Sequence, residues 1–407
     1  MVERMIWSRI WKEIKYCSQV FLLPIYALSF LMPRVSNIWV LGSTFGERFS
    51  DNPKYFFLYL KQYEKENVRA VWITKNRDIS RLLEENQLEA YYLYTLRGLW
   101  YCLRAKVYLY DNYSKDICFT LSGGALKINL WHGIPLKKIQ KDNKFDYVRN
   151  PRNWIEKIRF MLRRVSDEKP SDYVLTTSAY LMPIFASAFQ TSNIITCGYP
   201  RNDNLITKRL HNVLTKQEKA ELQMIVSKDE TTKIYIYLPT FRSSEAVFFE
   251  IIQRNRLNEF LEQKRIMLLI KPHPKSREYI RYKELTGNRI KVLNPCDDPY
   301  PFLEAVDGMI TDYSSIFFDF LLTGKPIIFF PFDLKEYCSQ ARELYFNYQD
   351  YTPGLIVTNQ TELEEALEKP VLYQKKIHDI LEKTYDKPEQ FASRQLYESI
   401  KEILKER

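Results

Sequence analysis

The chain lacks the arrangements by which cysteine marks a zinc site or a redox pair. Its six cysteines are scattered over 407 residues, with no CxxC pair and no spacing that suits zinc. We interpret them as thiols of a reducing compartment, which argues against a disulfide-stapled secreted domain. Carboxylates are also dispersed, without the paired spacing that a divalent cation needs. The sequence therefore predicts no metal site and no cofactor.

A long hydrophobic run is missing as well. Residues 20–32 are apolar but are interrupted by Pro24, and a bilayer-spanning helix needs about 20 apolar residues. Ahead of them Trp7, Ile10, Trp11 and Ile14 recur with helical spacing among basic residues, a pattern that predicts an amphipathic helix with a basic face. We predict that residues 1–34 form a monotopic membrane-associating segment. A helix packed on the protein body is the alternative.

The composition is that of a globular chain with an excess of positive charge. Hydrophobic residues make up 45% and charged residues 27%, which is enough to build two domains of ordinary size. The net charge of +10 indicates an anionic partner, such as nucleic acid, lipid headgroups or a phosphate-rich substrate. None of the recognisable nucleic-acid-binding motifs is present, so we expect no nucleic acid.

Two series of strand-like runs alternate with helix-like segments. The first series comprises residues 38–41, 70–73, 90–93, 107–110, 127–130 and 173–176. The second comprises residues 234–237, 267–270, 290–293, 308–310, 326–330 and 354–357. This alternation is typical of βαβ units and predicts an α/β fold with two mostly parallel sheets. We place a first domain at residues 35–205, a second at 206–370 and closing helices at 371–407, which pack on the second domain or return to the first.

Hydroxyl groups follow one strand of the second series directly. The apolar residues 308–310 lead into Thr311, Asp312, Tyr313, Ser314 and Ser315, and a helix-like run begins at residue 316. Hydroxyls and backbone N–H groups at such a strand-to-helix turn bind phosphate well. An N-cap without a ligand has the same residue types.

Two of the four histidines also follow strand-like runs. His132 lies in the sequence WHGIPLKK and His273 in IKPHP. Open α/β sheets bind ligands at the carboxyl ends of their strands, so both histidines have positions typical of a binding site. The loop at residues 42–46, after the first strand, would shape the same cleft.

Two further motifs accompany these three. Arg201, Asn202 and Asp203 lie in GYPRND, and Thr240 and Arg242 lie in LPTFR. Over residues 36–350 the set, in this order, resembles the CDP-glycerol glycerophosphotransferase family of teichoic acid and capsule synthesis. The resemblance implies a GT-B layout, two Rossmann-like halves facing one cleft. It implies transfer of glycerol phosphate from CDP-glycerol to a hydroxyl of a lipid-linked saccharide or growing polymer, with release of CMP.

The resemblance also implies roles for the motif residues. Histidines of the two matched motifs are implicated in catalysis, and we predict that His132, in the acceptor half, is the base; the reversed assignment to His273 stays open. The predicted substrate-binding residues are Lys137, Lys138, Arg201, Asn202, Asp203, Thr240, Arg242, Lys271, Thr311, Asp312, Ser314, Ser315 and Asp319. Arginine is expected to bind phosphate oxygens through its guanidinium fork. Asp312 and Asp319 would orient the loop or accept from glycerol hydroxyls, and Asp319 could equally be a structural partner of a nearby lysine.

A basic run follows the His132 motif. Residues 137–164, beginning with Lys137 and Lys138, interleave ten lysines and arginines with apolar side chains. Such a run is expected to bind an anionic membrane surface and to bring the cleft to a lipid-linked acceptor; a solvated helix is the alternative. We therefore predict a peripheral protein at the cytoplasmic face of the cell membrane.

Several alternatives stay open at this stage. The donor could be CDP-ribitol or a nucleotide sugar used in capsule synthesis, or the chain could be a non-catalytic peripheral membrane protein. The acceptor, the number of units added and the oligomeric state are not specified by the sequence.

Overall fold

The computed structural model describes residues 19–207, 210–242, 245–340 and 343–407. The amphipathic helix predicted around residues 7–14 lies outside the described residues. Among the described residues, no helix combines the length and the apolar character needed to cross a bilayer. Pro24 occupies the first turn of α2 (Leu23–Ser29) rather than interrupting it, which is the helical position where proline is tolerated.

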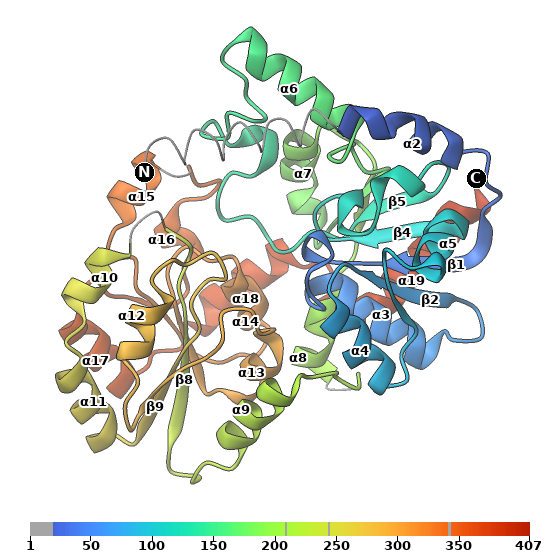
Figure 1. The fold of residues 1–407 in the computed structure, drawn as a ribbon. Helices are drawn as coiled ribbons and strands as arrows, with labels where there is room; N and C mark the ends of the chain where they lie inside the picture. Colours follow the sequence, from blue (N-terminus) through green and yellow to red (C-terminus); the bar gives the residue numbers. More distant parts are fainter. Residues whose placement is uncertain (1–18, 208–209, 243–244, 341–342) are drawn as a thin grey trace.

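Two parallel sheets dominate the described chain (Figure 1), in agreement with the expected α/β fold. We call each sheet with its helices a lobe. The first lobe contains β1 (Val35–Leu41), β2 (Arg69–Thr74), β3 (Ala90–Tyr92), β4 (Ala105–Tyr110), β5 (Leu126–Asn129), β6 (Tyr173–Thr176) and β7 (Ile194–Thr196). The second lobe contains β8 (Lys233–Leu238), β9 (Ile266–Ile270), β10 (Ile290–Val292), β11 (Gly308–Thr311), β12 (Ile327–Phe329) and β13 (Leu355–Ile356). The domain boundary expected at residue 205 falls between the two sheets and remains a prediction.

Both sheets have the strand order of a doubly wound fold. The first runs β3-β2-β1-β4-β5-β6-β7 and the second β10-β9-β8-β11-β12-β13. The direction of winding therefore reverses between β1 and β4 in one lobe and between β8 and β11 in the other. Ligands of such sheets bind outside the carboxyl ends of the strands at this reversal.

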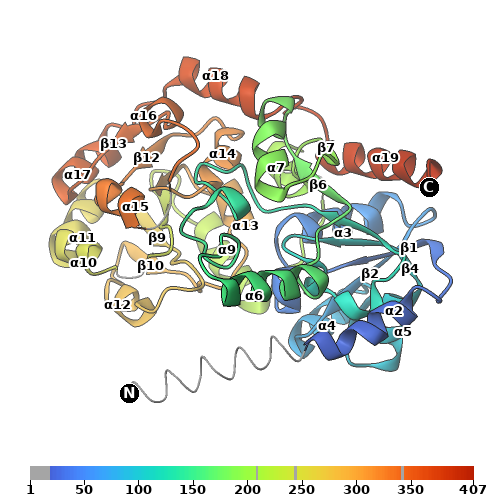
Figure 2. The same cartoon turned by 90° about the horizontal axis from the view of Figure 1, so that it is seen from above.

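Helices cover the sheets of both lobes (Figures 1 and 2). In the first half of the chain they are α3 (Asp51–Tyr63), α4 (Arg77–Glu85), α5 (Leu96–Arg104), α6 (Trp154–Val165), α7 (Met182–Phe189) and α8 (Asp203–Thr207). In the second half they are α9 (Lys216–Val226), α10 (Ala246–Ile251), α11 (Arg254–Gln263), α12 (Tyr279–Glu284), α13 (Tyr300–Ala305), α14 (Ile316–Leu321), α15 (Leu334–Gln340), α16 (Tyr348–Tyr351) and α17 (Gln360–Glu368).

The last two helices connect the lobes. α18 (Gln374–Thr384) contacts α14 of the second lobe, and α19 (Ala392–Lys405) packs against α3 of the first lobe. Figure 2 shows α18 beside the second lobe and α19 beside the first. The buried carboxylate of Asp203 accepts hydrogen bonds from the backbone N–H groups of Ala392 and Ser393, at 2.7 and 3.1 Å. This side chain therefore caps the start of α19.

Candidate active site

One cavity of about 250 Å³ collects loops from both lobes. It lies at the carboxyl ends of β1 and β5 in the first lobe and of β8, β9, β10 and β11 in the second. Its polar and charged lining residues are Thr44, Arg48, Ser50, Asp51, His132, Arg201, Lys271, His273, Asp297, Asp298, Tyr300, Ser314 and Ser315. The structure therefore brings together six of the predicted site residues: His132, Arg201, Lys271, His273, Ser314 and Ser315.

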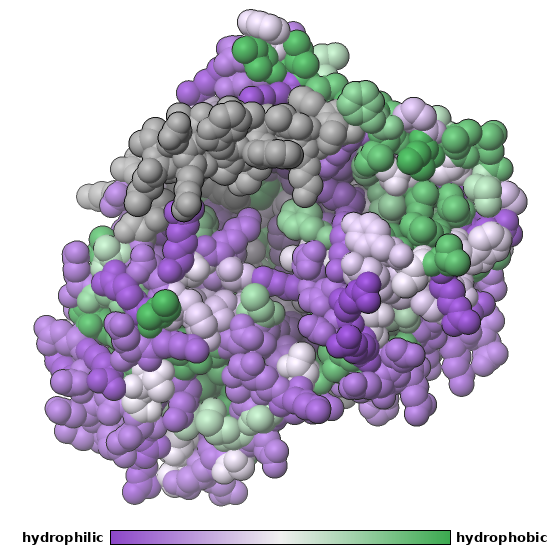
Figure 3. All heavy atoms as spheres, in the orientation of Figure 1, coloured by the Kyte–Doolittle hydropathy of each residue, from purple (hydrophilic) through white to green (hydrophobic). Residues whose placement is uncertain are grey.

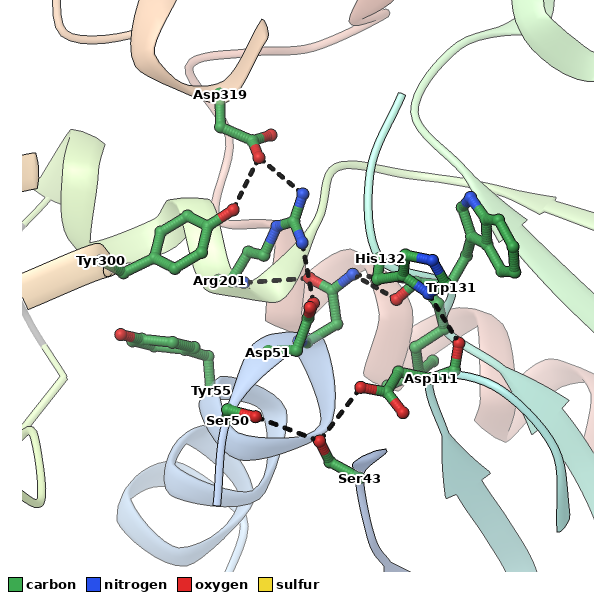
Figure 4. Close-up of polar contacts among 12 residues, drawn as sticks. Ser43, Ser50, Asp51, Tyr55, Asp111, Trp131, His132, Arg201, Tyr300 and Asp319 are labelled. Carbon is green, nitrogen blue, oxygen red and sulfur yellow. Dashed lines mark hydrogen bonds and ion pairs between the residues drawn. The ribbon is translucent and has the colours of Figure 1, made fainter. Parts of the chain in front are cut away.

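The loop that carries His132 is held by the side chain of Asn52, at the start of α3. The Asn52 amide donates to the backbone carbonyls of Leu130 and Trp131, at 3.1 and 3.0 Å (Figure 4). Trp131 adopts a left-handed backbone conformation, with φ at 52°. Such a conformation is strained for a bulky residue and persists only where its surroundings impose it.

The hydrogen bond of His132 defines which ring nitrogen is basic. Nδ1 lies 3.1 Å from the backbone carbonyl of Asp111, and because a carbonyl oxygen can only accept, Nδ1 carries the proton. In the neutral ring Nε2 then has the free lone pair. The side chain is exposed to the cleft, yet the surrounding protein lowers its pKa through desolvation, against the opposing charge of Asp51. The His132 ring therefore stays neutral at pH values at which an unperturbed histidine is already protonated.

His273 has the opposite arrangement. Its Nδ1 accepts a hydrogen bond from the backbone N–H of Lys275 at 3.1 Å, so the neutral ring carries its proton on Nε2. Burial lowers the pKa of His273 to about 4, and the positive charges of Lys275, Lys137 and Lys271 act in the same direction. A neutral imidazole N–H can donate to a phosphate oxygen.

Positive charge accumulates around His273, where the carboxylates of Asp297 and Asp298 oppose it in part. Burial, followed by the charge of Arg48, lowers the pKa of Lys271 to about 8. The Lys271 ammonium donates to the backbone carbonyl of Pro295 at 3.0 Å. Among the described residues, the guanidinium of Arg48 has one hydrogen-bond partner, the Cys296 Sγ at 3.7 Å. Mutual repulsion of these cations makes this side of the cavity a place for an anion.

The His132 motif and the hydroxyl turn approach each other at Gly133. This glycine has φ of +141°, and a Cβ built there would lie 2.8 Å from Ser315 Oγ and 3.2 Å from Arg201 Nη2. Only a glycine allows the first-lobe loop to come this close to Ser315. Ser314 and Ser315 are both half-buried in the lining, and their hydroxyls precede the short helix α14.

Arg201 reaches the cavity but is already neutralised by two carboxylates. Its Nη1 lies 2.8 Å from Asp51 Oδ1 and its Nη2 lies 2.6 Å from Asp319 Oδ2 (Figure 4). Asp319 is fully buried and also accepts from Asn202, Tyr300 and Tyr385, at 2.9, 2.6 and 2.8 Å. Asp319 is thus the centre of an internal network, a structural position in which Arg201 takes the place of the expected lysine.

The remaining predicted residues do not line the cavity. Arg242 pairs with Asp312 at 2.7 Å and with Asp333 at 2.6 Å, so its charge is balanced inside the second lobe. Both oxygens of Asp312 accept from the Thr240 N–H, and Thr311 Oγ1 donates to the Leu238 carbonyl. These side chains, like Asn202 and Asp203, are buried.

The predicted basic run joins the lobes at its first residues. The backbone of Lys137 forms a β-bridge with that of Leu344, and the Lys138 ammonium pairs with Glu343 at 3.0 Å. Neither lysine lines the cavity. Within residues 137–164, only α6 is an α-helix.

Several lining residues lie outside the predicted set, above all Arg48, Asp51, Asp297 and Tyr300. The glycine-containing loop at residues 42–46 was the one available signal for the first two. Within the described residues, no group of three or more histidine, cysteine or acidic side chains has an arrangement that could hold a metal ion.

Comparisons with known proteins agree with this geometry. A family model described as CDP-Glycerol:Poly(glycerophosphate) glycerophosphotransferase matches residues 25–402. The chain is 28% identical over 381 residues to a teichoic acid poly(glycerol phosphate) polymerase of Bacillus spizizenii, covering 88% of this chain and 91% of that one. It is 27% identical over 345 residues to a teichoic acid glycerol-phosphate transferase of Staphylococcus aureus, covering 82% and 84%.

Solved structures show the same fold. The wall teichoic acid polymerase TagF matches 98% of this chain and 98% of its own, with a TM-score of 0.70 and 25% identity. Because the family model spans nearly the whole chain, including every residue of the cavity, the chain belongs to the CDP-glycerol:poly(glycerophosphate) glycerophosphotransferase family.

Proposed function

We propose that the chain transfers glycerol phosphate from CDP-glycerol to a hydroxyl of a lipid-linked saccharide or growing teichoic acid polymer and releases CMP. Its family membership supports this reaction class. The observation that carries the proposal is that His132 of the first lobe, and His273 and Ser315 of the second, line one cavity. The first lobe would hold the acceptor and the second lobe the donor.

His132 is the proposed general base. Nε2 takes the proton of the acceptor hydroxyl, while the Asp111 carbonyl holds the proton on Nδ1. The acceptor oxygen forms a bond to the phosphorus of glycerol phosphate. The bond from that phosphorus to the bridging oxygen breaks, and CMP leaves with the electron pair. A lowered pKa keeps His132 unprotonated and ready to act.

The second lobe, together with Arg48 of the first, supplies the charge that stabilises the departing phosphate. Lys271 and Arg48 carry positive charge, His273 offers its Nε2 proton, and Ser314 and Ser315 offer hydroxyls. Such donors are fixed before the reaction begins and need no reorganisation. Arg201 and Arg242, whose charges are balanced by carboxylates, hold the loops in position instead.

The apolar surface of the first lobe supports membrane association. Phe21, Ile25, Leu28 and Leu31, in or beside α2, and Trp154, Ile155, Ile158, Met161 and Val165 of α6 are all exposed. Lys169, which follows α6, lies over the ring of Tyr26 in α2 at 5.1 Å, so the two helices are neighbours. Figure 3 shows apolar side chains gathered over α2 and α6. We propose that this surface meets the cytoplasmic face of the membrane.

A donor panel tests the reaction. The full chain is incubated with a lipid-linked acceptor and CDP-glycerol, CDP-ribitol or common nucleotide sugars, and nucleotide release is measured. We expect CMP release with CDP-glycerol. His132→Gln should lower the rate by at least about 100-fold, the scale of a general base, whereas the matched control His211→Gln, at an exposed position outside the cavity, should retain it. Release from CDP-ribitol or a nucleotide sugar alone would refute the donor assignment.

A further inference from the structure

Asp51 begins α3 with a strained backbone. Its φ is +62°, and Thr44, Phe45 and Trp131, which belong to the loops around the same cavity, also have positive φ values. These four are half of the eight non-glycine residues with positive φ in the described chain. Strain of this kind is typical of functional sites. Half of the strained non-glycine residues of the described chain therefore lie in the loops around His132.

The two oxygens of the Asp51 carboxylate have different surroundings. Oδ1 accepts from Arg201 Nη1 at 2.8 Å and from the Asn52 N–H at 2.7 Å. Oδ2 has no hydrogen-bond partner among the described residues, and the side chain is 23% exposed in the lining of the cavity. One oxygen thus fixes the carboxylate, and the other can accept a hydrogen bond from a ligand.

Charge decides which ligand this oxygen accepts. A donor diphosphate is repelled by a carboxylate and attracted by Lys271, which lines the cavity from the second lobe. An uncharged hydroxyl has no such penalty and donates well to a carboxylate. Asp51 is also linked to the loop that carries His132, because the side chain of its neighbour Asn52 donates to the carbonyl groups of Leu130 and Trp131. Figure 4 shows the Asp51 carboxylate bound to Arg201, with His132 lying beside this pair.

We propose that Asp51 is an acceptor-binding residue: its Oδ2 accepts a hydrogen bond from the hydroxyl next to the attacking one, and so selects acceptors that end in a vicinal diol. The attacking hydroxyl then faces Nε2 of His132. This inference rests on the proposed function and adds the chemical class of the acceptor. Asn52 and Arg201 are the positioning residues that hold the carboxylate.

The test compares two soluble acceptors with the full chain and CDP-glycerol. One is an alkyl ester of glycerol phosphate, and the other is the matching propane-1,3-diol phosphate ester, which lacks the neighbouring hydroxyl. We expect wild type to prefer the glycerol acceptor in kcat/KM by roughly 10- to 100-fold, the value of a hydrogen bond to a charged group. Asp51→Asn, which keeps an oxygen for Arg201, should lose most of this preference and leave the KM for CDP-glycerol unchanged.

The control is Asp78→Asn, at an exposed carboxylate paired with Arg81 on the surface, which should keep the full preference. An equal loss on both acceptors in Asp51→Asn would show a purely structural role and overturn the inference. Equal use of both acceptors by wild type would also overturn it, whether or not the variant folds. Absence of transfer by wild type to either acceptor and to a lipid-linked one would instead overturn the proposed function.

Discussion

At the scale of single residues, local hydrogen bonds distinguish two histidines that the sequence presents as equivalents. Both follow a strand and both line the cavity, but Nδ1 of His132 donates to a carbonyl whereas Nδ1 of His273 accepts from an N–H group. In the neutral state these bonds leave a lone pair on Nε2 of His132 and a proton on Nε2 of His273. The first nitrogen suits a base and the second suits a phosphate ligand.

Lys271 leads to a prediction about pH. Because its pKa is lowered to about 8, the ammonium is charged below that pH and loses its proton above it. We expect kcat/KM for CDP-glycerol to fall as the pH rises through about 8, since kcat/KM reports the free enzyme. A bound diphosphate stabilises the ammonium, so kcat should fall only at higher pH. Lys271→Arg, whose guanidinium stays charged, should abolish this fall. An unchanged profile in that variant would assign the limb to another group.

Residue partners also mark the limit of what the sequence can predict about the site. His132, His273, Lys271, Ser314 and Ser315 were found because each occurs in a motif at a strand end. Arg242 also follows a strand end within a motif, yet its charge is balanced by ion pairs with Asp312 and Asp333. No local sequence pattern distinguishes an arginine that is available to bind phosphate from one that is paired with carboxylates in the fold. Arg48 and Asp51 were not predicted as site residues, because neither occurs in a recognisable motif.

At the scale of elements, hydrophobic runs located the strands well. Every expected strand is present, because parallel strands buried on both faces read as continuous apolar runs. The structure adds one strand that was not expected, β7, which is only three residues long. The basic run was less predictable: its apolar spacing suggested one amphipathic segment, but helix forms only in α6, where Asn153 caps the start by accepting from the Glu156 N–H.

The exposed face of α6 gives an element-level prediction. Replacing Trp154, Ile158 and Met161 with serine removes apolar area that would enter the headgroup region, at about 1.5–3 kcal/mol for each fully buried side chain. We expect binding to vesicles containing anionic lipid to weaken at least about tenfold in a flotation assay. Transfer to a soluble acceptor should be unchanged.

Matched controls for α6 come from the second lobe. Val226 at the end of α9 and Ile280 in α12 are 69% and 75% exposed. If serine at these two positions weakened vesicle binding as much as the α6 changes, general hydrophobicity and not a defined surface would be responsible.

At the scale of the whole molecule, a buried polar network joins the two lobes. Asp319 in α14 accepts from Arg201 and Asn202 of the linking segment and from Tyr385, which follows α18. Removing one partner leaves the others uncompensated in a dry environment. Arg201 and Tyr300 of the cavity wall therefore depend on Asp319, which does not itself line the cavity.

Asp319→Ala should destabilise the protein by about 3–5 kcal/mol, the cost of breaking a buried ion pair by removing one member. Differential scanning calorimetry would show a lower Tm. Asp319→Asn, which retains part of the hydrogen bonding, should lose less. A Tm unchanged in the alanine variant would mean that α18 and α19 alone hold the lobes together.

A second buried contact between the lobes has a consequence for dissecting this enzyme. The ammonium of Lys54 in α3 and the carboxylate of Asp298 lie 2.7 Å apart, at 1% and 2% exposure, and Tyr55 donates to the same oxygen. If the two lobes were expressed as separate polypeptides, the first would expose the ammonium of Lys54 and the second the carboxylate of Asp298, both of which are buried in the intact chain. We expect the fragments to be insoluble alone and to recover when they are produced together.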